Sequence, residues 1–295
     1  YVSKSGNDSN PGTAGSPVLT IGQAVVLVAA SVTGGTAANT VSIGDGTYTE
    51  TVTYSGSNIT YKSTSSDRTA VIVTQSSGRT FNFSKGTTAN TIQHITVQNT
   101  DDTALNAGIY GANGGSGNYG SYIVEDCIFD CKPQAVIYAY GSKFRRTKFL
   151  VNAADTGADV IGLNSGKGAD GATLDFESCL FVGWDTRAVV AMSTGYCIVR
   201  NCTFILAAST RSTSYLFRAD GTNNEIYNSI AYGGDSSVDY GFRVTAGATQ
   251  TIKNCISFGA TGNPFYGEDG DTVSAQLEDN THVATDGNPI FTAIG

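Results

Sequence analysis

Apolar and polar residues alternate in short runs along most of the chain, and each run ends at a polar corner. Runs such as "AVIYAY" (135–140), "AVVAMS" (188–193) and "YGFRVT" (240–245) are three to six residues long. Short alternating runs rich in Val, Ile, Phe and Tyr are typical of β-strands, and they are too short for the helices of an α-helical repeat. The pattern predicts an all-β chain of short strands.

One phrase recurs between these runs. "VEDCIFD" (124–130) returns as "FESCLFV" (176–182), and weaker copies align on seven positions: Ile95, Cys127, Thr147, Cys179, Cys202, Ser229 and Cys255. Successive copies are separated by 20 to 32 residues. A constant core phrase with loops of variable length indicates a solenoid in which each repeat forms one coil and insertions project from its side.

Coils of this length predict a parallel β-helix, in which each strand pairs with the coils above and below it. The aligned small residues should then form one interior column. A second column should contain Phe129, Phe149, Phe181 and Phe204. Cysteines on the first column are therefore predicted to be reduced core residues, while Cys131 and Cys197 lie off the column and are not assigned by it.

An open solenoid end needs a cover, and the segment "PVLTIGQAVVLVAASV" (17–32) provides one. Thr20 followed by Gln23 is a helix-capping signature, and an apolar run follows it. We therefore predict two parts: residues 1–38 as an N-terminal strand and capping helix, and residues 39–295 as one continuous β-helix.

Composition narrows the functional classes. The chain has 295 residues, a formal net charge of −8, no basic run longer than Arg145-Arg146 and no apolar run long enough to cross a bilayer. We therefore expect no nucleic-acid partner and no membrane insertion. Residue 1 is Tyr rather than Met, so we expect either a removed leader or a piece of a longer protein.

Several segments carry a family resemblance. "YVSKSGNDSNPGTAGSPVLTIGQAV" (1–25), "VSIGDGTYTETVTYSGSNITYKSTSSDRTAVI" (41–72), the repeated "NCTF" phrases and the closing "NPIF" resemble the pectate-lyase-like superfamily. The resemblance covers nearly the whole chain and implies a single-stranded right-handed parallel β-helix. That superfamily includes polysaccharide lyases, glycoside hydrolases, bacterial surface proteins and phage tailspike-like fibres, so fold alone does not select an activity.

Lyases of this superfamily use Ca²⁺ held by carboxylates and a basic side chain, and hydrolases use two carboxylates. The acidic cluster in "NTDDTA" (99–104) therefore makes Asp101, Asp102 and Lys132 the catalytic candidates, with Asp101, Asp102 and Asp130 as candidate Ca²⁺ ligands. No cofactor is otherwise required. The same aspartates also suit plain β-helix corners, and the other motifs expected of polygalacturonases or calcium-dependent lyases are absent.

Loops of successive coils are expected to stack into one lateral stripe. The candidate saccharide-binding residues on it are Trp184, Asp185, Arg187, Asp130, Arg211, Tyr110 and Tyr119, with Asp155, Asp159 and Asp235 in equivalent loops. An aromatic residue flanked by Asp and Arg suits stacking on a sugar ring with hydrogen bonds at its edge.

The primary prediction is an extracellular, cell-surface or virion module that presents a lateral glycan-binding or adhesive face and is not an enzyme. The first alternative is a secreted Ca²⁺-dependent polysaccharide lyase or glycoside hydrolase acting on an acidic polysaccharide. The second is a purely structural fibre or lattice component. The expected partner is a polysaccharide or cell-surface glycan, with a homotrimer or attachment to a larger assembly as a further expectation, and unpaired core thiols suit folding in a reducing cytoplasm.

Overall fold

The structure is a computed structural model. It describes residues 1–31, 39–54, 56, 58–83, 89–101, 106–111, 121–132, 134–137, 139, 141–152, 161–163, 173–184, 190–191, 196–206, 215–219, 223–233, 240–244, 251–258, 265–267, 277–278 and 281–283.

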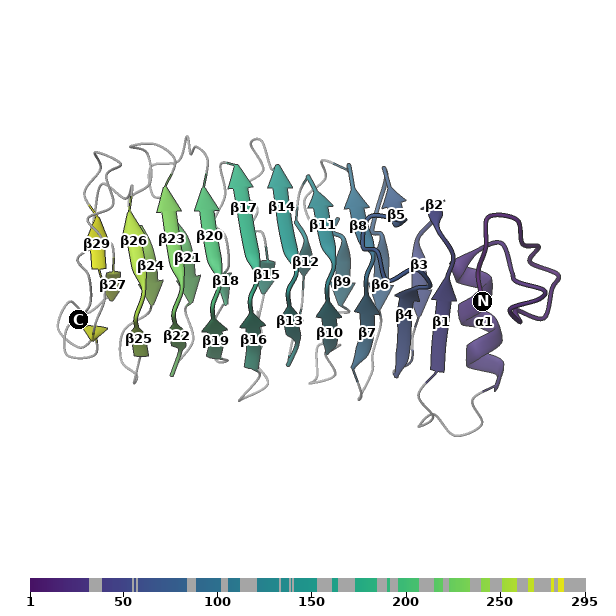
Figure 1. The fold of residues 1–295 in the computed structure, drawn as a ribbon, viewed down its shortest axis with the longest axis horizontal. Helices are drawn as coiled ribbons and strands as arrows, with labels where there is room; N and C mark the ends of the chain where they lie inside the picture. The colour runs from purple at the N-terminus through teal and green to yellow at the C-terminus, as the bar shows by residue number, and fades with distance from the viewer. Residues whose placement is uncertain are drawn as a thin grey trace.

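Three parallel sheets run side by side along the molecule, and each coil contributes one strand to each sheet (Figure 1). Sheet A has the order β1 (Asn39–Ile43), β4 (Ile59–Ser63), β7 (Asn90–Gln93), β10 (Tyr122–Glu125), β13 (Lys143–Arg145), β16 (Thr173–Glu177), β19 (Tyr196–Arg200), β22 (Glu225–Tyr227), β25 (Thr251–Lys253), β28 (Leu277–Glu278). Sheet C has the order β2 (Gly46–Thr49), β5 (Val71–Gln75), β8 (Thr96–Asn99), β11 (Ile128–Cys131), β14 (Lys148–Asn152), β17 (Leu180–Trp184), β20 (Thr203–Leu206), β23 (Ile230–Gly233), β26 (Ile256–Phe258), β29 (Thr281–Val283).

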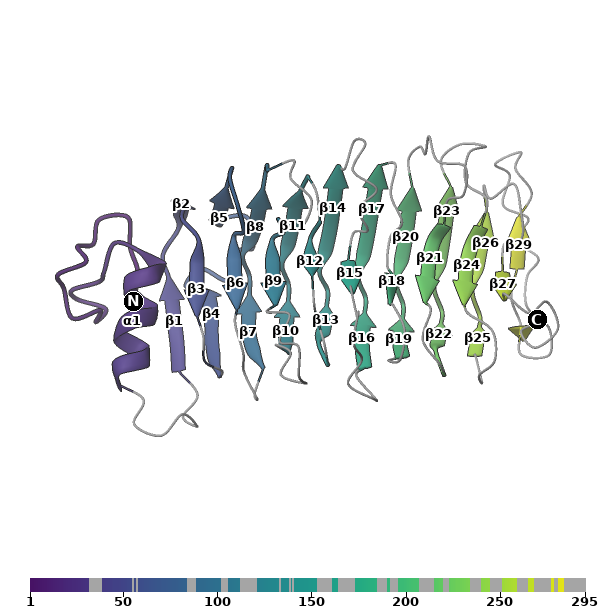
Figure 2. The same cartoon turned by 180° about the vertical axis from the view of Figure 1, so that it is seen from behind.

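Sheet D has the order β3 (Val52–Tyr54), β6 (Phe81–Phe83), β9 (Ile109–Gly111), β12 (Val136–Ile137), β15 (Ile161–Leu163), β18 (Val190–Ala191), β21 (Tyr215–Ala219), β24 (Tyr240–Val244), β27 (Phe265–Gly267). Strands β1 and β29 lie at opposite ends of this stack, as Figure 2 also shows from behind. The predicted parallel β-helix is confirmed.

The recurring phrase forms two strands with a corner between them. In "VEDCIFD", β10 ends at Glu125, Asp126 adopts a positive φ of 54°, and β11 begins at Ile128. Equivalent corner residues with φ between 47° and 55° are His94, Arg146, Ser178, Asn201, Asn228 and Asn254. A single left-handed residue turns the chain sharply, so a coil has three strands where the sequence pattern showed two.

The residue after each of these corners points inward and forms the predicted small-residue column. Its members are at most 3% exposed: Ile95, Cys127, Thr147, Cys179, Cys202, Ser229 and Cys255. The phenylalanine column is confirmed as well, since the ring centroids of Phe149 and Phe181 lie 4.8 Å apart and those of Phe181 and Phe204 lie 4.7 Å apart, with planes 9° from parallel in both pairs. Each coil thus repeats the same slice of core.

All six cysteines are buried and unbonded. This confirms the prediction for the column cysteines and extends it to Cys131 and Cys197. Burial raises the pKa of the Cys127 and Cys197 thiols to about 12 and that of Cys255 to about 11, because a thiolate loses its hydration in the core. These thiols are packing residues.

Helix α1 (Ile21–Ser31) covers the first coil, as predicted. Thr20 caps it, since its Oγ1 accepts the Gln23 N–H at 3.1 Å. The carboxylate of Glu50, from the turn between β2 and β3, accepts the N–H groups of Ile21 at 2.9 Å and Gly22 at 2.8 Å. A carboxylate at a helix N-terminus satisfies free N–H groups and opposes the helix dipole, so Glu50 fastens the cap to the solenoid.

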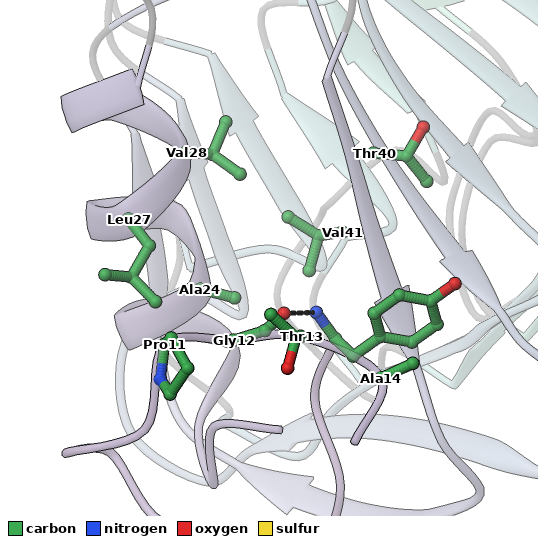
Figure 3. Close-up of a pocket in the computed structure, with 10 residues that line it drawn as sticks. Pro11, Gly12, Thr13, Ala14, Ala24, Leu27, Val28, Thr40 and Val41 are labelled. Carbon is green, nitrogen blue, oxygen red and sulfur yellow. Dashed lines mark hydrogen bonds between the residues drawn. The ribbon is translucent and has the colours of Figure 1, made fainter. Parts of the chain in front are cut away.

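A hollow of about 440 Å³ lies between α1 and the N-terminal segment. Figure 3 shows Ala24, Leu27 and Val28 on the helix side and Val41 on the β1 side, and the Tyr1 ammonium group donates to the Gly12 carbonyl at 2.6 Å below them. In the part of the chain described above, no helix has both the length and the apolar character that a bilayer crossing requires. The domain boundary at residue 39 stays a prediction.

Candidate functional site

The outer face of sheet D carries one continuous row of side-chain positions along the solenoid. Neighbouring strands place them in register: Thr53, Asn82, Tyr110, Ile137, Gly162, Val190, Arg218, Arg243 and Tyr266. The flanking Phe81, Ile109, Phe217 and Phe242 are buried in the core. Because side chains alternate across a strand, Thr53, Asn82, Tyr110, Arg218 and Arg243 of this row face away from the core.

The first cluster on this face joins Arg79 and Tyr110. The guanidinium carbon of Arg79 lies 3.1 Å from the centroid of the Tyr110 ring, and its Nη1 donates to Asn82 Oδ1 at 3.3 Å. The ring and the amide hold the guanidinium against the sheet surface. A flat cation stacked on an aromatic ring, close to an amide, can contact both the carboxylate and the ring of an acidic sugar.

The second cluster joins Arg218, Arg243 and Tyr215. The guanidinium carbons lie 5.6 Å and 4.6 Å from the centroid of the Tyr215 ring, and Arg243 Nη1 donates to the Tyr215 hydroxyl. Arg218 and Arg243 pair directly in register, so two cations stand on adjacent rungs of a chain whose net charge is −8. Like charges one rung apart repel, and an anion bound between them would relieve that repulsion.

Asp101 lies at the corner that leads from β8 towards β9. Its carboxylate accepts the Gly78 N–H at 2.6 Å and the Asn106 Nδ2 amide at 2.9 Å, and only 9% of the residue is exposed. The neighbouring Asn99 donates to the carbonyls of Gly78 and Ala107. Asp101 thus ties the loops before β6 and β9 together, which is the corner role that the sequence also allowed.

Asp130 and Lys132 do not share a loop with Asp101. Asp130 lies within β11 on the outer face of sheet C, where it accepts Gln98 Nε2 at 3.0 Å. This corrects its predicted position in a loop. Asp130 points outward because side chains alternate along a strand and its neighbours Phe129 and Cys131 both lie in the core. Lys132 is exposed just after β11, and its N–H donates to the Asn99 carbonyl at 2.8 Å.

The predicted Ca²⁺ ligands are therefore not shown together. Among the described residues no group of three or more His, Cys, Asp and Glu side chains could hold a metal ion. Asp102 lies outside the described residues, so this Ca²⁺ site stays a prediction.

The saccharide-binding stripe is only partly described. Trp184 ends β17 and pairs in register with Asn152 of β14, at the end of a strand rather than in a free loop. Tyr110 was predicted in a loop of this stripe but lies in β9 on the outer row of sheet D. The remaining members lie outside the described residues: Tyr119, Asp155, Asp159, Asp185, Arg187, Arg211 and Asp235.

Sequence reasoning missed Arg79, Arg218, Arg243 and Tyr215. A signal for two of them was present, because "LFRA" (216–219) and "GFRV" (241–244) repeat an Arg directly after a buried Phe. In a solenoid, a repeated inward Phe followed by Arg places the Arg side chains in one outward row.

Comparison with known proteins identifies the fold. No protein-family model matches the chain, and no curated protein matches its sequence. A pectin methylesterase solved in complex with a hexasaccharide has 14% identity and a TM-score of 0.51, with 96% of this chain and 88% of that chain covered. The fold is a right-handed parallel β-helix, as the resemblance in the sequence implied.

Two further solved chains are similar to this one. Escherichia coli YbhC has 14% identity and a TM-score of 0.50, covering 92% of this chain and 83% of its own. The pectin methylesterase of Yersinia enterocolitica has 10% identity and a TM-score of 0.49, covering 89% and 90%.

These neighbours correct the primary functional prediction. The β-helix aligns over nearly its whole length with pectin methylesterases, one of them bound to a hexasaccharide. That finding contradicts a non-catalytic glycan-binding or adhesive module, and it agrees better with the stated alternative of an enzyme acting on an acidic polysaccharide.

Proposed function

We propose that the chain is an enzyme acting on an acidic polysaccharide that lies along the outer face of sheet D. The observation that carries this proposal is that Tyr110, Arg218 and Arg243 lie on one row and that each of them takes part in an arginine–tyrosine contact. Tyr110 and Arg218 are four rungs apart, or about 19 Å at about 4.8 Å per rung. An extended polyanion parallel to the solenoid axis would meet a guanidinium group at both ends of this span.

Ester hydrolysis is the reaction we propose to test first, since the aligned chain of known activity is a pectin methylesterase. The reaction needs a carboxylate that either attacks the ester carbonyl carbon itself or activates a water molecule to do so. It also needs a hydrogen-bond donor that stabilises the developing oxyanion. We propose Asp102 and Asp185 for the carboxylate role, because each directly follows a corner or strand end that leads from sheet C to sheet D. Arg187 is the candidate donor.

The lyase and glycoside hydrolase routes use the other candidates. In a lyase, Lys132 would be the base and Asp101, Asp102 and Asp130 would hold Ca²⁺; in a hydrolase, two of the carboxylates would act as acid and base. The hydrogen bonds on Asp101 and the outward position of Asp130 favour ester hydrolysis over both routes.

We also propose that the enzyme meets its polysaccharide outside the cell, where such polymers occur. A homotrimer or larger assembly would form through the outer face of sheet C, whose C-terminal half is mostly apolar. Its apolar outward residues are Leu150, Leu180, Val182, Ile205, Ile230 and Tyr232, with Lys148 and Thr203 on the same face. Apolar strips of this kind on a solvent-facing sheet mark association surfaces.

The test is an activity panel on methyl-esterified and ester-free polygalacturonate, with Ca²⁺ or with a chelator. Methanol release indicates ester hydrolysis, ultraviolet absorbance of unsaturated uronates indicates a lyase, and new reducing ends alone indicate a hydrolase. We expect methanol release, unchanged by chelator. Absence of all three products would overturn the enzyme proposal.

The binding face is tested with the double variant Arg218→Gln/Arg243→Gln. Loss of two charge-assisted contacts should raise KM at least about tenfold, since each such contact contributes about 1.5–3 kcal/mol. Arg200→Gln is the matched control, because Arg200 lies on sheet A and pairs with Asp175 at 3.4 Å. A KM that changes equally in both variants would contradict binding along sheet D.

A further inference from the structure

The corner between β4 and β5 is much longer than the corners that follow it. It runs from Thr64 to Ala70, whereas the next corner, between β7 and β8, consists of His94 and Ile95. The long corner extends over later coils: the Arg68 carbonyl accepts Thr96 Oγ1 at 2.7 Å, and Arg68 Nη1 donates to the Arg146 carbonyl at 3.3 Å. Since β4 and β13 are three rungs apart in sheet A, the corner and the Arg68 side chain together extend over about 14 Å of the solenoid.

A hollow of about 540 Å³ lies between this corner and the left-handed corner residues beneath it. We call it the corner hollow, and its lining is wholly polar: Ser66, Asp67, Arg68, His94, Asp126 and Arg146. A neighbouring hollow of about 400 Å³ shares Ser66 and His94 and continues to Lys62 and Tyr1. The corner hollow lies between sheets A and C, so it is separate from the row on sheet D.

The two carboxylates of the corner hollow are already engaged. Asp126 accepts Nε and Nη2 of Arg146, each at 2.8 Å, and this forked pair lowers the pKa of Asp126. One oxygen of Asp67 accepts both the N–H and the hydroxyl of Thr69, which lowers the pKa of Asp67. Both groups therefore stay ionised in neutral solution and hold their neighbours in place.

Arg68 and His94 are the groups with donors left to offer. A guanidinium has five N–H groups, and the hydrogen bond of Arg68 to the Arg146 carbonyl uses one of them. Arg68 is exposed and His94 is half-buried, so both are accessible from the hollow. A guanidinium fork matches a carboxylate, while imidazole, Ser66 and the ionised aspartates match sugar hydroxyls.

We propose that the corner hollow is a second saccharide site, which takes one uronate unit with its carboxylate on Arg68 and its hydroxyls on Ser66 and His94. The ligand class rests on the proposed function, but the site does not, because it shares no residue with sheet D. Such a site anchors the polymer outside the reacting segment. It adds affinity for long chains through a higher effective concentration at the enzyme.

The chain has two histidines, His94 and His282, so the imidazole carbon-bound protons report the site directly. The experiment titrates trigalacturonate into the full chain and follows the two histidine signals by NMR, with His282→Gln to assign them. We expect a saturable shift of the His94 signal and none for His282. Arg68→Gln should weaken this binding at least tenfold at unchanged Tm, and Arg68→Lys should weaken it less because the charge remains.

Two variants serve as controls. Arg200→Gln on sheet A and the sheet D double variant Arg218→Gln/Arg243→Gln should both leave the His94 titration unchanged. A static His94 signal at saturating trigalacturonate would overturn the proposal, and so would an equal response to uncharged maltotriose. If the His94 titration succeeds while the activity panel shows no product, the proposed enzyme function fails and the corner hollow stands. If the activity panel shows product while the His94 signal stays unchanged, the corner hollow is rejected as a saccharide site and the proposed enzyme function stands.

Discussion

The interior position after each left-handed corner accepts only small residues or a β-branched one. Cys127, Cys179, Cys202 and Cys255 fill it in four coils, Thr147 and Ser229 in two, and Ile95 in one. The thiols point back to backbone carbonyls, as Cys202 Sγ does to Arg200 O at 3.3 Å. The position therefore combines close packing with one weak hydrogen bond.

Alkaline pH should destabilise the fold through these thiols. An unfolded thiol ionises near pH 8.5, whereas burial holds the pKa of Cys127 and Cys197 at about 12. Above pH 8.5 the unfolded state binds fewer protons than the folded state, so the free energy of unfolding falls as pH rises, by up to about 1.4 kcal/mol per thiol and pH unit. Urea unfolding at pH 7.0 and 9.5 measures this, and an unchanged midpoint would contradict it.

The same thiols predict a reactivity pattern. Native protein should not react with a thiol reagent at neutral pH, and denatured protein without reductant should show six thiols, because all six are buried and unbonded. Fewer than six thiols in denaturant would reveal disulfides and contradict the reduced core.

The corner residue is the second constraint at this scale. Asn201 has φ of 55°, which Asn tolerates and a β-branched residue does not. Asn201→Val should therefore lower the free energy of unfolding by about 1–3 kcal/mol. Ser178 has the same φ, so Ser178→Asn should instead raise Tm slightly; thermal unfolding measures both, and a loss of stability in Ser178→Asn would contradict this account.

Among the elements, α1 depends most on contacts from outside itself. Its sequence contains no acidic residue in the first turn. That charge comes from Glu50, which is 29 residues from Ile21 and 28 from Gly22. The Asp8 carboxylate in turn accepts the Thr20 hydroxyl at 3.0 Å. The helix is therefore stabilised by the coil that it covers.

Removing the cap contacts should loosen α1. Thr20→Ala should cost about 1 kcal/mol, the usual loss at an N-cap. Glu50→Gln should cost at least as much, because it removes the charge at the helix dipole while nearly conserving size. Chemical denaturation measures both, with Glu225→Gln on sheet A as the matched control. An equal loss of stability in Glu225→Gln would show that the net charge of the protein, and not the contact at the helix N-terminus, determines the effect.

For the whole molecule, the outer faces of the three sheets differ in character. Sheet D carries the arginine–tyrosine clusters. Sheet C begins with a bonded polar ladder, Thr74 to Gln98 to Asp130, and becomes apolar from Leu150 onwards. Ile230 and Tyr232 are 36% and 37% exposed there. One face is thus suited to an anionic ligand, and another to a protein surface.

Self-association should depend on the apolar half of sheet C. We expect the wild-type chain to sediment as more than a monomer. Val182→Lys/Ile205→Lys should return it to a monomer with intact β-structure by circular dichroism, because two charges on adjacent strands of one row would have to be desolvated at the contact. Thr49→Lys, on the outward row of the N-terminal strand β2, is the control. A wild-type monomer at every concentration would reject this surface.

Much of the fold was predictable from sequence because each coil repeats one slice of core. In each coil a corner residue is followed by a small residue and then by a phenylalanine at a short, constant spacing. The two interior columns and the parallel β-helix follow from this repeat, and the capping helix follows from the local signature at Thr20. The number of strands per coil could not be predicted from the sequence, since a single left-handed residue such as Asp126 turns the chain without changing the apolar alternation.

The candidate site depended on tertiary structure. Asp101, Lys132 and Trp184 were placed by sequence at coil corners, but only the register shows that Asp130 faces outward from sheet C and Tyr110 from sheet D. Arg68 and Arg146 are 78 residues apart and meet only because the coils between them stack in register. Repeating local pattern determines which residues enter the core; which outward side chains become neighbours is decided by loop lengths and by the register between coils.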